Sequence, residues 1–191
     1  MVVLNKIYTR QGDDGTTALG TSERVPKYAL RVAAYGTVDE TNAAIGVARL
    51  HLAAEPMVDA MMARIQNDLF DLGSDLCVPD RGTRPGYEPP ITDVHVARLE
   101  SEIDAMNAEL TPLRSFVLPG GSPAAATLHV ARTVARRAER LVVELASTPE
   151  EPVNPAGIKY INRLSDLLFV ASRYVNGRGK GDVLWVPGQN R

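Results

Sequence analysis

The sequence has one cysteine, few aromatic residues, no long apolar run and no marked excess of charge of either sign. A single cysteine, Cys77, permits no internal disulfide, which is typical of the reducing cytoplasm. No apolar run approaches the ~18 residues that a membrane span needs, and the first residues lack the apolar core of a signal peptide. The net charge of -2 gives no general attraction to nucleic acid. We therefore expect a cytoplasmic protein that binds neither membranes nor nucleic acids.

What the sequence does contain is enough for an ordinary globular core. Hydrophobic residues make up 45% of the chain and charged residues 23%, whereas aromatic residues, at 5%, argue against a β-sandwich. At roughly 150 residues per domain we expect one domain over residues 1–191. Within it we distinguish a polar, glycine-punctuated N-terminal loop (1–35), a helical part (36–177) and a C-terminal tail (178–191).

Five segments carry helix signals, and they are expected over residues 37–54, 57–77, 93–110, 122–147 and 154–177. Thr37 and Glu40 fit a capping box, which would place Asp39 in the first helical turn, where its charge suits the helix dipole. Thr92, Ser122 and Asn154 are the expected N-caps of the last three helices, and proline follows the latter two. Short links and the absence of a convincing strand predict an all-α, antiparallel five-helix bundle.

Three familiar motifs for phosphate or metal binding are missing. The only Gly-Lys pair, Gly179-Lys180, is followed by glycine, so the sequence has no P-loop. The glycines of 177–181 follow a helix and not a strand, which indicates a flexible exit and no dinucleotide fingerprint. No histidine has glutamate three residues before it, which excludes a di-iron bundle. We interpret the three histidines as structural or surface residues: His51, His95 and His129.

The most informative segment is an arginine stripe on the fourth predicted helix. Arg132, Arg136 and Arg140 lie four residues apart and so share one face, where each pair repels by a few tenths of a kcal/mol. Two interpretations stay open. The stripe is either a solvated face next to acids such as Glu139 or a polyphosphate site, because guanidinium groups match phosphate oxygens. If the fourth and fifth helices are neighbours, Asn162 could meet this stripe.

Two further segments have both an ordinary and a functional interpretation. Residues 9–17 are rich in glycine and hydroxyl groups, with cations at Arg10 and Lys27 nearby. This composition is typical of a phosphate cradle, and equally of ordinary Asp-Gly turns. Phe116 stands before Pro-Gly-Gly, and its simplest interpretation is a core anchor.

Taken together, these segments resemble the PduO-type ATP:cob(I)alamin adenosyltransferases. The resemblance follows the order of the chain, spans nearly all of it, and is carried by residues 7–17, 24–27, 35–40, 64–73, 116–122, 132–140 and 159–166. It implies a ferritin-like, up-and-down five-helix bundle that assembles as a homotrimer, with active sites between subunits. It also implies transfer of the 5′-deoxyadenosyl group of ATP to cob(I)alamin, giving adenosylcobalamin and triphosphate. Mg²⁺ would accompany ATP without a metal site of the protein's own.

The resemblance also assigns roles to individual residues. Six residues would line the nucleotide from one subunit: Thr9, Arg10, Gln11, Gly12, Thr17 and Lys27. Five would line it from the neighbouring subunit: Arg136, Arg137, Glu139, Arg140 and Asn162. Asp39 and Arg132 match a pair that forms a salt bridge across the subunit interface. Phe116 matches the residue that packs beneath the corrin and displaces its lower ligand.

These roles make Arg136, Lys27 and Phe116 the expected catalytic residues. The implied protein partners are a reductase that makes Co(I) and an adenosylcobalamin-dependent enzyme that accepts the product. The alternative is a non-enzymatic adenosylcobalamin carrier, or a nucleotide-binding regulator, on the same bundle. The arginine stripe and the N-terminal loop are both intact, which favours the enzyme.

Overall fold

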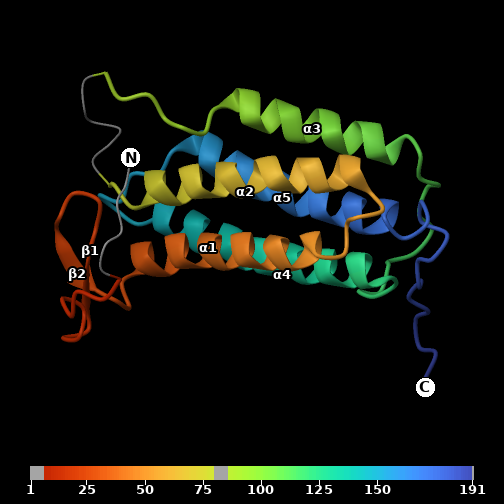
Figure 1. Ribbon diagram of the computed structural model, residues 1–191, viewed down its shortest axis with the longest axis horizontal. Helices are drawn as coiled ribbons and strands as arrows, with labels where there is room; N and C mark the ends of the chain where they lie inside the picture. Colours follow the sequence, from red (N-terminus) through yellow and green to blue (C-terminus); the bar gives the residue numbers. More distant parts are fainter. Residues whose placement is uncertain (1–6, 80–85, 191) are drawn as a thin grey trace.

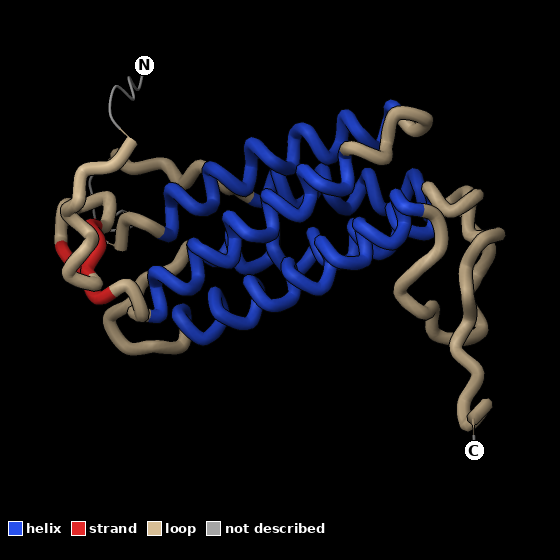
Figure 2. The backbone as a smooth tube through the Cα atoms, turned by 60° about the horizontal axis from the view of Figure 1, so that its bottom comes forward, coloured by secondary structure: helices blue, strands red, loops and turns tan. Residues whose placement is uncertain are grey.

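The computed structural model describes residues 7–79 and 86–190. Its five helices are α1 (Leu30–Arg49), α2 (Pro56–Leu76), α3 (Asp93–Asn107), α4 (Pro123–Ala146) and α5 (Pro155–Tyr174). Consecutive helices run in opposite directions (Figure 1). The N-terminal segment adds a small antiparallel hairpin that the sequence did not indicate, made of β1 (Thr16–Ala18) and β2 (Arg24–Pro26). The hairpin lies at one end of the bundle of five helices (Figure 2).

The helices are not arranged in sequence order around the bundle. α1 packs between α2 and α4, and α5 packs between α4 and α3. α3 and α5 run in the same direction, because Lys159 pairs with Asp93 and Arg163, one turn on, pairs with Glu100. α4 therefore lies between α1 and α5, which fixes the side of the molecule on which its polar face emerges.

The apolar core follows from the periodicity of the helices. α4 contributes mainly small side chains, and Ala131, Ala135 and Ala138 are fully buried. Apart from Leu128 and Leu145 of α4, the largest core side chains lie outside this helix, for example Ile45, Met62 and Tyr160. Because an alanine adds little bulk, neighbouring helices approach α4 closely, and its remaining positions are free to be polar.

The start of the first helix differs from the sequence prediction. α1 begins at Leu30, after Ala29 in an extended conformation, so the expected capping box at Thr37 is wrong. Thr37 is buried inside the helix, and its hydroxyl donates to the Ala33 carbonyl at 2.8 Å. Asp39 consequently lies in the middle of α1 and not in its first turn. The helix extends further back because Arg31 and Ala34 find buried positions against neighbouring segments.

The other three caps are confirmed. The Ser122 hydroxyl accepts a hydrogen bond from the Ala125 N–H at 3.2 Å, and the Asn154 side chain accepts one from the Ala156 N–H at 3.0 Å. At α3, the Thr92 N–H donates to Nδ1 of His95 at 3.2 Å, so this histidine is structural as expected. These helix starts were predictable because each cap acts within three residues of sequence.

A buried polar cluster joins α2, α3 and α5. The Tyr160 hydroxyl donates to Oδ2 of Asp68 at 2.7 Å, and Arg98 forms an ion pair with the same carboxylate. Burial raises the pKa of Tyr160 well above its ordinary value of 10, and the charge of Asp68 raises it further. The hydroxyl therefore remains protonated and keeps its role as donor.

We expect Tyr160→Phe to lower the free energy of unfolding by about 1.5–3 kcal/mol, the range for a hydrogen bond to a charged group. Urea denaturation measures this loss. Tyr28→Phe is the matched control, because Tyr28 is 88% exposed and should change stability little. Equal unfolding free energies for Tyr160→Phe and wild type would show that the hydroxyl does not stabilise Asp68.

Candidate functional site

The N-terminal loop folds around Arg24, a residue to which sequence reasoning gave no role of its own. The Arg24 guanidinium donates to the Thr16 hydroxyl at 3.0 Å and also reaches the Gln11 carbonyl. Lys27 donates from Nζ to the Gly12 carbonyl at 2.7 Å. Three of the predicted nucleotide-binding residues, Gln11, Gly12 and Lys27, are thus held together in one loop.

The remaining predicted residues of this loop lie on the same exposed surface or beside it. Arg10 adopts a left-handed backbone conformation with φ of 62°, and its guanidinium lies 5.7 Å from the centre of the Tyr8 ring. Thr9 precedes it and is exposed. Thr17 belongs to β1. Burial raises the pKa of Tyr35 of α1, and the side chain of Thr17 opposes this larger effect by lowering it. The loop is therefore attached to the start of α1 while its glycine and arginine groups face solvent.

The residues of the arginine stripe lie on one face of α4, as their spacing of four predicted. Arg136 and Arg140 are exposed, and together with Glu139 they line a surface groove of about 400 Å³. α4 and α5 are neighbours, and Asn162 donates to Oε1 of Glu139 at 2.7 Å, so Asn162 meets an acid of this face. Neither Arg136 nor Arg140 forms an ion pair with a carboxylate in the part of the chain that the structure describes. Their charges are thus free to bind an anion.

Two further arginines of α4, one of them the first residue of the stripe, behave differently. Arg137 forms an ion pair with Glu40 of α1 at the surface. Arg132 is half-buried, and its Nε is buried without a hydrogen-bond partner. Burial lowers the pKa of Arg132, and the positive charge of Arg136 lowers it further. Arg132 is therefore a partly dehydrated cation that still needs an acceptor.

Asp39, the expected partner of Arg132, lies elsewhere in the same chain. Asp39 is exposed on α1 and lines a groove of about 400 Å³ with Tyr35 and Phe70. The two side chains form no ion pair within the described residues of one chain. The expected pair is therefore not formed within one chain.

Phe116 lines a third groove, of about 610 Å³, which is also lined by Phe169 of α5 and by Arg132. The interpretation of Phe116 as a core anchor is wrong, because its side chain is 77% exposed. Its ring lies beside that of Trp185, with 6.0 Å between ring centres. An apolar wall therefore adjoins the arginine stripe at Arg132.

Within one chain the N-terminal loop and the segment of Phe116 lie at opposite ends of the bundle (Figure 1). Figure 1 shows β1 and β2 at one end of the bundle and the connection from α3 to α4, which carries Phe116, at the other. No hydrogen bond or ion pair joins residues 9–27 to the arginine stripe among the residues described. One chain therefore does not bring the N-terminal loop and the segment of Phe116 together (Figure 1).

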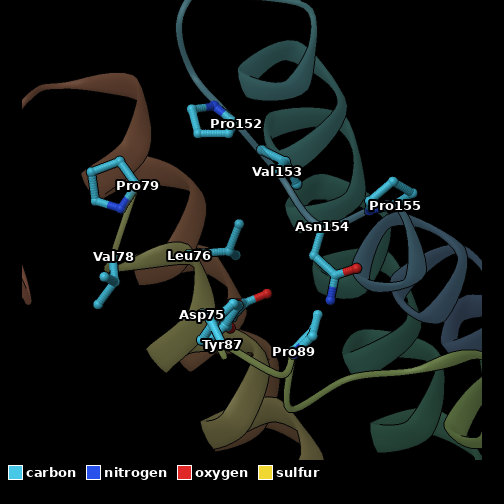
Figure 3. A pocket seen from close by; sticks show the side chains of 10 residues that line it. All are labelled: Asp75, Leu76, Val78, Pro79, Tyr87, Pro89, Pro152, Val153, Asn154 and Pro155. Atoms are coloured by element: carbon cyan, nitrogen blue, oxygen red, sulfur yellow. The ribbon is translucent and has the colours of Figure 1, made fainter. Parts of the chain in front are cut away.

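A smaller cavity lies apart from all these residues. It has a volume of about 190 Å³, and Figure 3 shows its lining side chains, which come from the end of α2 and from the segments before α3 and α5. Most of them are apolar, and its acid, Asp75, accepts a hydrogen bond from the Tyr87 hydroxyl. The cavity contains none of the predicted site residues.

The described residues contain no group of three or more histidine, cysteine, aspartate or glutamate side chains that could hold a metal ion. No helix among them is both long and apolar enough to cross a bilayer.

His129 lies buried behind the Phe116 groove. Its ring packs on Phe169, with 6.3 Å between ring centres, and Nδ1 has no hydrogen-bond partner. Burial lowers the pKa of His129 below its ordinary value of 6.5, and the charge of Arg132 lowers it further, whereas Asp182 acts in the opposite direction. The imidazole is therefore neutral at neutral pH.

Because the pKa of His129 is lower in the folded than in the unfolded chain, its protonation favours unfolding. The neutral His129 side chain contributes its full share to the free energy of unfolding above about pH 6.5. This contribution is lost as the pH falls toward the lower pKa of the folded state. We expect the urea midpoint to fall more for wild type than for His129→Gln between about pH 7.5 and pH 5.5. His51→Gln, at an exposed position, should follow wild type. Parallel curves for His129→Gln and wild type would contradict this account.

Comparison with known proteins gives a consistent result. Residues 7–175 match the family model described as cobalamin adenosyltransferase. A corrinoid adenosyltransferase of Mycobacterium tuberculosis is 50% identical over 191 residues, which are 100% of this chain and 97% of that protein. The corrinoid adenosyltransferase of Bacillus subtilis is 45% identical over 182 residues, 93% of this chain and 91% of that protein.

Solved structures share the fold. A variant of the PduO-type ATP:corrinoid adenosyltransferase from Lactobacillus reuteri, complexed with cobalamin and ATP, has a TM-score of 0.87 at 37% identity. The match covers 95% of this chain and 97% of that one. A second variant, complexed with ATP, has a TM-score of 0.84 at 37% identity, over 94% of this chain and 100% of that one. The predicted five-helix fold is confirmed, and this chain belongs to the cobalamin adenosyltransferase family.

Proposed function

We propose that this corrinoid adenosyltransferase moves the 5′-deoxyadenosyl group of ATP to Co(I) of cobalamin and releases triphosphate, at sites shared between the subunits of a homotrimer. One observation carries the proposal. Arg132 lines the apolar groove of Phe116, and Arg136 and Arg140 follow it along the same face of α4. An apolar wall suited to a corrin therefore meets a row of cations suited to a triphosphate at Arg132 of α4.

The arginine stripe accounts for the departure of triphosphate. Negative charge grows on the leaving oxygen as the C5′–O bond breaks, and fixed donors aimed at that charge lower the barrier. Arg136 and Arg140 are such donors, because no carboxylate neutralises them in the described chain. The nucleophile is the cobalt of the substrate, so the protein needs no serine, cysteine or lysine for attack.

Mg²⁺ fits this site as a companion of the nucleotide. The described residues offer it no cluster of acidic or histidine ligands, whereas the phosphate oxygens of ATP are the hard ligands that it prefers. Bound there, it would share the neutralisation of phosphate charge with the arginines. Two acidic residues, Glu139 and Glu144, line the groove of Arg136 and Arg140. Glu139 already accepts a hydrogen bond from Asn162.

Phe116 supports the second part of the chemistry. We propose that its exposed ring packs beneath the corrin, where it excludes both the lower ligand and water. Loss of that ligand makes Co(II) easier to reduce to Co(I). The half-buried Arg132 lines the same groove, so the position of the cobalt is coupled to that of the triphosphate.

The second half of the nucleotide site comes from another copy. Residues 7–29 would form the ATP-binding loop, with Thr9, Arg10, Gln11, Gly12, Thr17 and Lys27 facing the stripe of the adjacent subunit. This arrangement is supported by the opposite placement of the hairpin and the Phe116 segment in one chain (Figure 1). It also gives Asp39 and Arg132 their partner, because each lacks an ion pair within its own described chain.

The cellular setting belongs to the same proposal. We propose a cytoplasmic enzyme that works with a reductase and passes adenosylcobalamin to a dependent enzyme. The alternative, a carrier or regulator, would bind cobalamin without cleaving ATP. Incubation of the protein with ATP and chemically reduced cobalamin separates them: adenosylcobalamin and triphosphate should appear in equal amounts. Binding of both substrates without triphosphate release would favour the carrier.

Arg136→Ala should reduce turnover about 10²–10³-fold, the effect of removing one preorganised donor from a developing charge. The bundle should remain folded, because Arg136 is exposed and its loss leaves no buried group unpaired. Initial rates at saturating ATP and cobalamin measure the change. Arg163→Ala, which removes a surface arginine paired with Glu100, is the control and should keep its activity. A rate within threefold of wild type for Arg136→Ala would remove this residue from the site.

Asp39 and Arg132 should act as a pair between subunits. We expect Asp39→Asn, Arg132→Ala and the double variant to show a coupling energy well above the ~0.5 kcal/mol of an exposed pair. The dissociation constant of the trimer, from analytical ultracentrifugation, and the turnover rate are the two readouts. Additive effects of the two substitutions would mean that the side chains do not meet.

A further inference from the structure

The segment that carries Phe116 is held at both ends by the C-terminal end of α5. Arg173 is buried, donates to the Thr111 carbonyl at 3.0 Å and forms an ion pair with Asp182 at 2.7 Å. Asn176 accepts a hydrogen bond from the Ser122 N–H at 3.0 Å, and it donates to Oδ1 of Asp182 at 3.3 Å. One polar cluster therefore ties down the two ends of the segment from 111 to 122 and also fixes the start of the C-terminal tail.

The tail then pairs with the middle of the same segment. The Leu118 N–H donates to the Val183 carbonyl at 2.8 Å, and the Trp185 N–H donates to the Phe116 carbonyl at 2.8 Å. The Ser115 hydroxyl donates to the Trp185 carbonyl at 2.6 Å. The backbone on both sides of Phe116 is thus bonded to residues 183–185, a short extended stretch that follows Asp182 and forms the C-terminal strand.

The glycines around this cluster show how closely it is packed. Gly121 has φ of 97°, and a Cβ there would lie 2.6 Å from the Asn176 side chain. A Cβ on Gly181 would lie 2.8 Å from the same side chain. The N–H of Gly179 donates to the Arg173 carbonyl at 2.8 Å, so the expected flexible exit at 177–181 is instead a hydrogen-bonded turn.

Core packing does not position the Phe116 ring. Its side chain is 77% exposed, and the only ring beside it is that of Trp185, itself 44% exposed, in the described structure. What fixes Phe116 is therefore its backbone and the tail strand. That strand is anchored in turn by Asp182, whose side chain and that of Arg173 are each 5% exposed.

We propose that Arg173 and Asp182 are positioning residues for adenosyl transfer, which hold the Phe116 ring in place through the C-terminal strand. The inference rests on the proposed function of Phe116 and adds residues that do not touch the substrate. The ion pair is buried, so removal of one charge leaves the other without a counter-ion and releases the start of the strand. Phe116 then loses the fixed backbone that aims its ring at the groove.

Asp182→Asn tests this directly, because it keeps the shape of the side chain and removes its charge. We expect kcat to fall at least tenfold while KM for ATP stays within twofold of wild type. The fraction of four-coordinate cob(II)alamin formed with ATP, measured by absorption and electron paramagnetic resonance, should fall by more than half. Asp68→Asn is the matched control: it makes the same change in another Arg–Asp pair and should lower stability but leave both readouts unchanged.

A double-mutant cycle shows whether the pair acts through Phe116. In a Phe116→Ala background, Asp182→Asn should produce no further loss of kcat or of four-coordinate cob(II)alamin. Trp185→Pro, which removes the backbone N–H that donates to the Phe116 carbonyl at an exposed position, should behave in the same way, and it serves if Asp182→Asn does not fold. Wild-type values of both readouts in Asp182→Asn or, where that variant does not fold, in Trp185→Pro, or additive losses with Phe116→Ala, would overturn the inference. Absence of transfer in the wild-type protein would instead overturn the proposed function.

Discussion

The close packing of α4 between α1 and α5 is the constraint on which the rest of the structure depends. Buried alanines, among them Ala131, Ala135 and Ala138, let both neighbours approach the helix. Because these three positions take up the inward face, the residues at 132, 136 and 140 must point away from the core. The outward direction of the arginines therefore follows from the inward direction of these alanines. A bulkier side chain at one of the alanine positions would push the neighbouring helices away and shift the arginines with α4.

Two kinds of arginine in this protein differ in burial and in partners. Arg31 is buried, donates to Glu151 at 2.8 Å and also reaches the Leu76 carbonyl, and Arg173 is similarly paired with Asp182. Such arginines join segments of the scaffold, because a buried charge persists only when it is paired. Arg136 and Arg140 have no carboxylate partner in the described chain, which marks them as groups kept available for a ligand.

One chain separates two parts of the proposed site. The hairpin beside Gln11, Gly12 and Lys27 and the connection from α3 to α4, which carries Phe116, lie at opposite ends of the same bundle (Figure 1). The apolar wall and the arginine stripe are continuous at Arg132 within one chain. In the proposed homotrimer a second chain would add its N-terminal loop, and adenosyl transfer would then depend on assembly.

The sequence by itself determined the number of helices, three of their caps, the shared face of the arginines and, through its motifs, the family. These features depend on residues three or four apart, whose relation any helix fixes. It did not predict the start of α1 at Leu30, where Arg31 is stabilised by Glu151 from a distant segment. Only the tertiary structure decided that Phe116 is exposed, and that Arg173 and Asp182 anchor the strand beside it. These properties arise from contacts between segments far apart along the chain, and no local pattern encodes which surfaces such segments leave uncovered.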